Sequence, residues 1–223
     1  MSISSLRLLQ LCSANLPTGA YAFSQGLETG CDEGWLRNFD DAYQWLDVQL
    51  THSLGSSELP LLIRSMNALK DSDLNAQQHW NQMALAIRET HELRLTDSAT
   101  GKALLRVLKG LESNNIEHAF DTQNEVSFIS AFALAAYQWD IEVDDACIGY
   151  AWSWLENQVA AATKLVPLGQ THSQQLLEQL QPHVLHAIEL ARQCDDDEIG
   201  SSLPALAIAS CWHEHQYSRL FRS

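Results

Sequence analysis

Apolar residues recur at helical spacing along nearly the whole chain, and sustained alternation with a period of two is absent. One example follows Ser57, where Leu59, Leu62, Ile63 and Met66 fit an i, i+3, i+4, i+7 pattern. This spacing places the apolar side chains on one face of an α-helix. Because we find no internal repeat, low-complexity tract or interdomain linker, the sequence predicts one all-α domain over residues 1–223, a bundle of roughly eight to ten helices.

Capping residues predict where several of these helices begin. Four successive helices are predicted to start at the N-cap residues Asn38, Ser57, Asp73 and Ser98, with Gly110 ending the last of them. After a loop at residues 113–121, two more are predicted to start at the capping boxes Thr122–Glu125 and Thr171–Gln174. Pro182 should kink or divide the second of these. The final helix is predicted to run from about Ser202 to Trp212.

The helix predicted over residues 143–166 is apolar on most sides. Ile148, Trp152 and Leu155 line one face, and Trp154 with the alanines at 160–162 leaves little polar surface opposite. Such a helix is usually buried. By contrast, the helix predicted to start at Asp73 ends in a charged segment whose side chains we expect to point mostly outward: Arg88, Glu89, Glu92 and Arg94.

The charge of the chain limits the classes of partner. Acidic side chains outnumber basic ones 28 to 13, and the formal net charge is −15. Such a surface repels phosphate backbones and anionic lipid heads, which excludes nucleic acid and membrane as favoured partners. The five cysteines are spread out, form no CxxC pair and are odd in number, as is typical of reduced thiols in the cytosol. We find no signal peptide and no apolar run of membrane-spanning length, so a soluble cytoplasmic protein is expected.

The chain offers little that resembles a catalytic or metal site. His213 and His215 are two positions apart and would face different sides of a helix, and His183 and His186 lack a matching carboxylate or thiol. Surface or cap histidines are therefore the preferred interpretation. The sequence AFSQG at 22–26 resembles a nucleophile elbow, but an elbow needs a preceding strand. Phosphate-binding glycine loops are absent. We predict no catalytic residue, no metal ligand and no cofactor.

Three segments are not explained by helix packing alone. Residues 16–28 combine Pro17, two glycines and two aromatics without periodicity. Residues 163–169 place a single cation, Lys164, at the end of the most apolar helix, where it could stabilise the helix dipole or contact a partner. The tail at about 213–223 has Leu220 and Phe221 between two arginines, beyond Trp212, the last residue of the core-facing pattern. We expect water to reach both apolar side chains unless a partner covers them.

These segments resemble the urease accessory protein F family. LPTGAYAFSQGLE at 16–28 resembles its N-terminal signature, and RETHELR at 88–94 and GYAWSWLENQVAAATKLVPLGQ at 149–170 resemble its middle blocks. DEIGSSLPALAIASCWHEHQYSRLFRS at 197–223 resembles its C-terminal block. The similarity covers nearly the whole chain, weakens around 110–125 and keeps the blocks in the family's order.

The resemblance implies a non-enzymatic, cytoplasmic scaffold that dimerises and helps to insert nickel into apo-urease. It would bind urease accessory protein D (called H in some organisms) and recruit the nickel-carrying GTPase, urease accessory protein G. The tail residues implied to enter the D-type partner are Tyr217, Arg219, Leu220, Phe221 and Arg222. Tyr21, Glu28 and Lys164 would lie on or near the surface for dimerisation and the GTPase. Lys164 could act as a finger supplied in trans, but conformational gating is the preferred interpretation. The alternative is an all-α metal-dependent hydrolase using scattered His and Asp.

Overall fold

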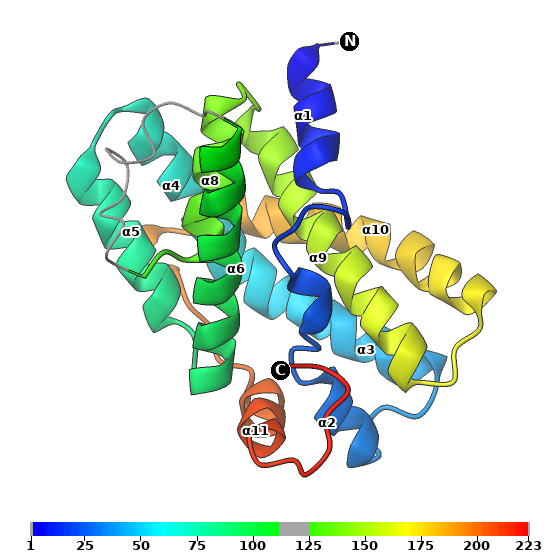
Figure 1. The fold of residues 1–223 in the computed structure, drawn as a ribbon. Coiled ribbons are helices and arrows are strands. Elements are labelled where there is room, and N and C mark those ends of the chain that lie inside the picture. Colours follow the sequence, from blue (N-terminus) through cyan, green and yellow to red (C-terminus); the bar gives the residue numbers. More distant parts are fainter. Residues whose placement is uncertain (1, 112–124, 223) are drawn as a thin grey trace.

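A computed structural model describes residues 2–111 and 125–222, and every regular element among them is a helix (Figure 1). This confirms the all-α prediction. The α-helices are α1 (Ile3–Leu11), α2 (Leu27–Asp32), α3 (Phe39–Gln49), α4 (Leu59–Lys70), α5 (Leu74–Ala86), α6 (His91–Gly110), α8 (Phe128–Gln138), α9 (Val143–Leu165), α10 (Gln170–Gln193) and α11 (Pro204–His213). Short 3-10 helices lie at η1 (Ala20–Ala22) and η3 (Asp196–Glu198). In this described part of the chain, no helix has the length and apolar character needed to cross a membrane.

The predicted break at Ser57 does not occur. Asn38 caps α3 as predicted, its side chain accepting from the Asp41 N–H, but the backbone then continues through a π-helix, η2 (Leu50–Glu58), directly into α4. Ser57 lies inside this rod. Pro60 has no N–H to donate within the helix, and the Ser56 carbonyl four residues earlier accepts from the Gly200 N–H at 3.0 Å instead. A contact from far along the chain thus satisfies the backbone where the capping pattern predicted the start of a new helix.

The boundaries around α5 and α6 are partly as predicted. Asp73 caps α5, and Gly110 is the last residue of α6. However, α6 begins at His91 with Thr90 as its N-cap, which makes the predicted start at Ser98 wrong. This start places Glu92 in the first turn of α6, where it is buried, and leaves Arg88 in the preceding connection with a side chain that is only 15% exposed. The expectation that these two side chains point outward is wrong.

The second half of the chain supplies the longest helices. The prediction for residues 143–166 is confirmed by α9. α8 begins later than expected, capped by Ser127, with Glu125 ahead of the helix; Thr122 and the loop predicted at 113–121 lie outside the described residues. α10 already begins at Gln170, ahead of the predicted capping box, and it passes Pro182 without dividing.

The main core forms where α8 and α9 pack on α4 and where α10 packs on η2 and α9. α8 is apolar on all sides and is enclosed between α4 and α6. Side chains of this core that water does not reach include Leu46, Leu62, Leu104, Ile129, Phe132 and Leu155. A smaller apolar cluster is separate from it and joins Leu27, Leu36, Ala161, Ala162, Val166 and Phe221. This small cluster lies beneath the candidate site.

Candidate partner-binding surface

The last residues of the chain return to its first loop. Beyond α11, residues 214–222, here called the C-terminal strap, cross α2 and end beside η1, as Figure 1 shows in red. The strap is tied by its backbone, because the Arg222 N–H donates to the Ala22 carbonyl at 2.8 Å. Tyr21, the neighbour of Ala22, is exposed on the same loop. The N-terminal signature and the C-terminal block therefore form one surface.

Phe221 is part of the fold rather than a free anchor. Only 7% of the residue is exposed, and it packs in the small cluster with Leu27, Leu36 and Val166. The expectation that water reaches both Leu220 and Phe221 is thus wrong for Phe221 and right for Leu220, which is 67% exposed. The Phe221 side chain packs into the small cluster, while the Leu220 side chain stays outside it and faces solvent.

Glu28 explains why the strap adopts this register. The family resemblance implies that Glu28 lies on or near a partner surface, and in the structure it is buried in the first turn of α2, directly beneath the strap. Its Oε1 accepts from the Leu220 N–H at 2.6 Å and its Oε2 from the Phe221 N–H at 2.9 Å. Two backbone donors that would otherwise be unpaired next to the small cluster are satisfied by one carboxylate, and such charge-assisted hydrogen bonds are the stronger kind.

A buried histidine lies behind Glu28. His213, the last residue of α11, has no exposed surface and lies between Glu28 of α2 and Glu92 of α6. The interpretation of His213 as a surface or cap residue is therefore wrong, and Trp212, predicted to face the core, is half exposed. No local pattern marks this site, because its partners come from distant segments. The only indication in the sequence was that all three residues fall within the blocks that resemble the family.

Lys164 completes the site from α9. It lies in the last turn of the helix, and its Nζ is 5.4 Å from the centroid of the Phe221 ring. A cation over an aromatic face at this distance is attracted to it. Lys164 thus contacts the strap as well as the negative end of the helix dipole. Of the predicted residues, Glu28 and Lys164 both contact Phe221. The others contribute exposed side chains to the surface: Tyr21, Tyr217, Arg219, Leu220 and Arg222.

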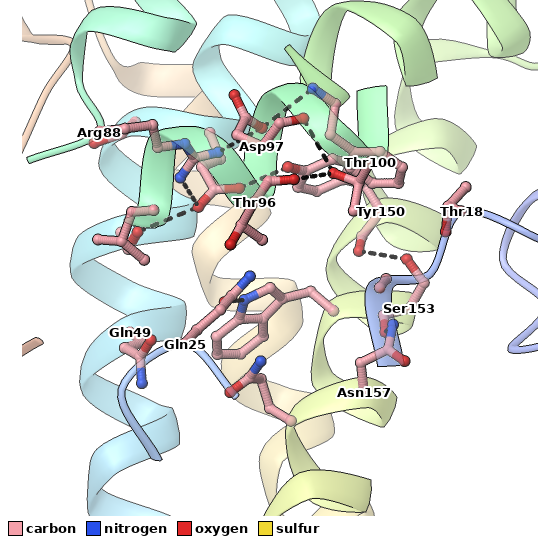
Figure 2. Close-up of a pocket in the computed structure, with 18 of the residues that line it drawn as sticks. Thr18, Gln25, Gln49, Arg88, Thr96, Asp97, Thr100, Tyr150, Ser153 and Asn157 are labelled. Carbon is pink, nitrogen blue, oxygen red and sulfur yellow. Dashed lines mark hydrogen bonds and ion pairs between the residues drawn. The ribbon is translucent and has the colours of Figure 1, made fainter. Parts of the chain in front are cut away.

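A cavity of about 120 Å³, lined by both polar and apolar side chains, lies between the helices and the N-terminal loop (Figure 2). Arg88 lines it, 2.9 Å from Glu58 and 3.3 Å from Asp97, and the Tyr150 hydroxyl donates to Glu58 at 2.6 Å. The network joins η2, α6 and α9. The Trp154 Nε1–H donates to Gln25 at 2.9 Å and so ties the N-terminal loop to the wall of the cavity.

The electrostatics of this cavity are those of a compensated buried ion cluster. Burial by itself would raise the pKa of Glu58, but the charge and hydrogen bond of Arg88, helped by Tyr150, lower it overall. Burial raises the pKa of Asp97, and Arg88 offsets this only in part because Glu58 adds repulsion. Sequence reasoning missed the cluster because Arg88 was assigned to an outer face. Among the described residues, no group of three or more His, Cys, Asp or Glu side chains is arranged to hold a metal ion.

These features define an all-helical protein whose two ends build one exposed surface over a buried glutamate–histidine pair. The chain belongs to the UreF family, whose model matches residues 36–181. It is 50% identical over 221 residues to the urease accessory protein UreF of Marinomonas sp. (strain MWYL1), covering 99% of this chain and 95% of that protein. It is 44% identical over 223 residues to the urease accessory protein UreF of Teredinibacter turnerae, covering 100% of both. These relatives give no support to the hydrolase alternative.

Proposed function

We propose that this protein acts in urease maturation by binding other proteins and has no turnover of its own. In the cytoplasm it would join the D-type (or H-type) accessory protein and the nickel-carrying GTPase G on apo-urease, so that nickel is inserted there. The family and the names of its relatives support a urease accessory role. The observation that carries the finer proposal is the strap, which is fixed to the body by Glu28 while its other side is exposed.

The D-type partner is proposed to bind the outer side of the strap. Tyr217 is fully exposed and Leu220 is 67% exposed, on a segment whose backbone is already held. A pre-ordered segment loses less conformational entropy on binding than a free tail does. Burying such side chains in a partner groove contributes about 1.5–3 kcal/mol each. Arg219 and Arg222 add donors suited to carboxylates of the partner.

Tyr21 and Lys164 are proposed to serve the GTPase. Tyr21 is exposed next to the end of the strap, and Lys164 rests on the strap through Phe221. Because Lys164 and the strap are in contact, a partner that moves one of them would also shift the position of the other. This favours gating of the GTPase over a lysine supplied directly to its active site. Glu28 contributes from below the surface, by fixing the strap.

The protein is also proposed to act as a homodimer, and α1 supports this. Ile3, Leu6 and Leu9 follow one another at i, i+3, i+6 on α1, and each is more than 60% exposed. The opposite side of the helix packs through Leu11 against the core. An exposed apolar stripe on an acidic protein is typical of an interface. If the stripe packs against the same stripe of a second copy, both are removed from water.

The test of the strap proposal is co-purification with the D-type accessory protein, using the full-length chain and the double variant Tyr217→Ala/Leu220→Ala. We expect the double variant to fold normally and to lose at least tenfold in affinity. Leu185→Ala is the matched control, because Leu185 is also an exposed leucine but lies on α10. Undiminished binding by the double variant would show that the strap is not the docking segment.

A further inference from the structure

We propose that His213 is a positioning residue, a buried clasp that holds Glu28 where it fastens the C-terminal strap, so that the strap is fastened when the imidazole carries two protons. This inference rests on the proposed function in one respect only, namely that the strap is the segment presented to a partner protein. The fastening itself is a property of the isolated chain.

The clasp is complete on the side of the histidine. His213 Nδ1 is 2.5 Å from Glu92 Oε1, and Nε2 is 3.1 Å from Glu28 Oε2. A carboxylate only accepts hydrogen bonds, and a neutral imidazole has a single N–H to donate. Both contacts are therefore hydrogen bonds only in the doubly protonated imidazolium. A neutral His213 leaves one of the two buried glutamates without its donor.

The clasp is equally complete on the side of the strap. Both oxygens of Glu28 are engaged by the consecutive N–H groups of Leu220 and Phe221. The second of these oxygens also accepts a hydrogen bond from the Nε2–H of His213, so the imidazole and the strap share one acceptor group. Removing the imidazolium leaves a buried carboxylate held by backbone dipoles alone, next to apolar side chains. The desolvation cost of the buried Glu28 carboxylate is relieved when water reaches it. Because the strap covers Glu28, the strap must move away for water to enter.

The charges around His213 come from every element packed on it. α2 contributes Glu28, α6 contributes Glu92, and α11 is followed directly by Glu214, whose carboxylate accepts from the Glu92 N–H at 3.0 Å. Lys164 of α9 lies on Phe221, the strap residue that Glu28 also holds. From α6 and α11, Thr90 and Ser210 add a neutral hydroxyl pair. The immediate neighbours of the imidazole are thus acidic, which favours its cationic form.

The direction of the pH dependence follows from these contacts. Burial alone would lower the pKa of His213, but the hydrogen bonds and charges of Glu92 and Glu28 outweigh it and raise the pKa above the ordinary 6.5. A group with a raised folded pKa contributes its full stabilisation below the unfolded value and loses it as the pH rises through the folded value. The strap should therefore be held most firmly below about pH 6.5 and loosen on the alkaline side of the raised pKa.

The test is hydrogen–deuterium exchange of the full-length protein across a pH series, with protection factors of peptides from 214–222 corrected for intrinsic exchange. We expect wild-type protection to fall with rising pH and His213→Gln to lower protection at least tenfold at acidic pH. His215→Gln is the matched control, because His215 lies two residues farther on and is exposed. If His213→Gln does not fold, Glu92→Gln replaces it. This variant leaves the Glu28–strap bonds in place and should move the loss of protection to lower pH.

Strap protection that is independent of pH in the wild type, or unchanged in the folded variants, would overturn the proposal. Equal losses of protection throughout the chain would also overturn it, because His213 would then support the whole fold and not the strap in particular. Co-purification with the D-type protein separates this inference from the proposed function. If the strap loosens as expected but the complex is not weakened, the role of His213 in holding the strap is supported. The proposal that the strap is the docking segment is then refuted.

Discussion

At the scale of single residues, the polar groups that organise this protein are the ones that water does not reach. Glu58, Asp97 and Glu92 are each about 5% exposed, and His213 is not exposed at all. Buried charges are tolerated only when they are paired, and each of these has an ion-pair partner. The exposed ion pair of Arg192 with Asp144 is a contrast, because surface pairs contribute little.

Replacing Arg88 by Met should therefore strongly lower the free energy of unfolding. The change removes the one cation between Glu58 and Asp97 and leaves two buried carboxylates without compensation, which costs about 3–5 kcal/mol. The measurement is equilibrium denaturation of the purified variant. Arg192→Met is the matched control and should unfold close to wild type, since its partners are solvent-exposed. Equal behaviour of the two variants would mean that the buried network does not stabilise the fold.

At the scale of elements, packing decides where helices end and which faces stay open. The α3–η2–α4 rod stays unbroken through Ser57 because it lies along α10 and because Gly200 satisfies the Ser56 carbonyl. Gly55 makes the close approach possible, since a Cβ there would be 3.3 Å from the Ala187 backbone. α1 shows the opposite situation, with one face on α9 and the other left without cover in the described chain.

If the open face of α1 is the dimer interface, Leu6→Arg should give a monomer. The guanidinium would have to be buried without a partner at the centre of the stripe, a cost of several kcal/mol that a modest interface cannot offset. Light scattering coupled to size exclusion measures the mass directly. Leu185→Arg is the control for an equally exposed leucine on α10 and should leave the mass unchanged. A Leu6→Arg protein that remains dimeric would place the interface elsewhere.

At the scale of the whole molecule, the two ends of the chain depend on each other. α2, the connection that follows it, the end of α9 and the strap share the small apolar cluster, and Phe221 is the only part of the strap within it. The surface proposed for partners therefore exists only when the strap is in place. A partner that binds the strap also acts on α2 and on Lys164.

Deleting residues 217–223 should keep the helical circular dichroism signal but lower the melting temperature. No helix lies beyond His213 in the described chain, yet the loss of Phe221 uncovers the small cluster. Phe221→Ala alone should cost about 3 kcal/mol, and a kcal/mol shifts the midpoint by about 2–4 °C in a chain of this size. Leu220→Ala, next to it but exposed, should melt like wild type. Loss of the helical signal on deletion would mean that the strap is required for the entire fold.

Periodicity and capping residues were enough to predict the helical class and many of the helices. Periodicity marked α9 almost to the residue, and Asn38 and Asp73 cap α3 and α5 as predicted, because such caps are satisfied by hydrogen bonds to residues two or three positions away. The resemblance of four blocks also singled out Glu28, Lys164 and Phe221, which lie together in the fold. These signals are local, or lie in the identity of the residues, and need no knowledge of the packing.

Which polar residues are buried depends on contacts that no local pattern in the sequence records. His213 meets Glu28 and Glu92, which are 185 and 121 positions away, and no spacing on its own helix could indicate either. The same reason applies to Arg88 and to Phe221, whose neighbours come from other segments. Helical periodicity tells which residues share a face but not what covers that face. Burial, and with it the ionisation of His213 and the position of the strap, is settled by contacts between distant parts of the chain.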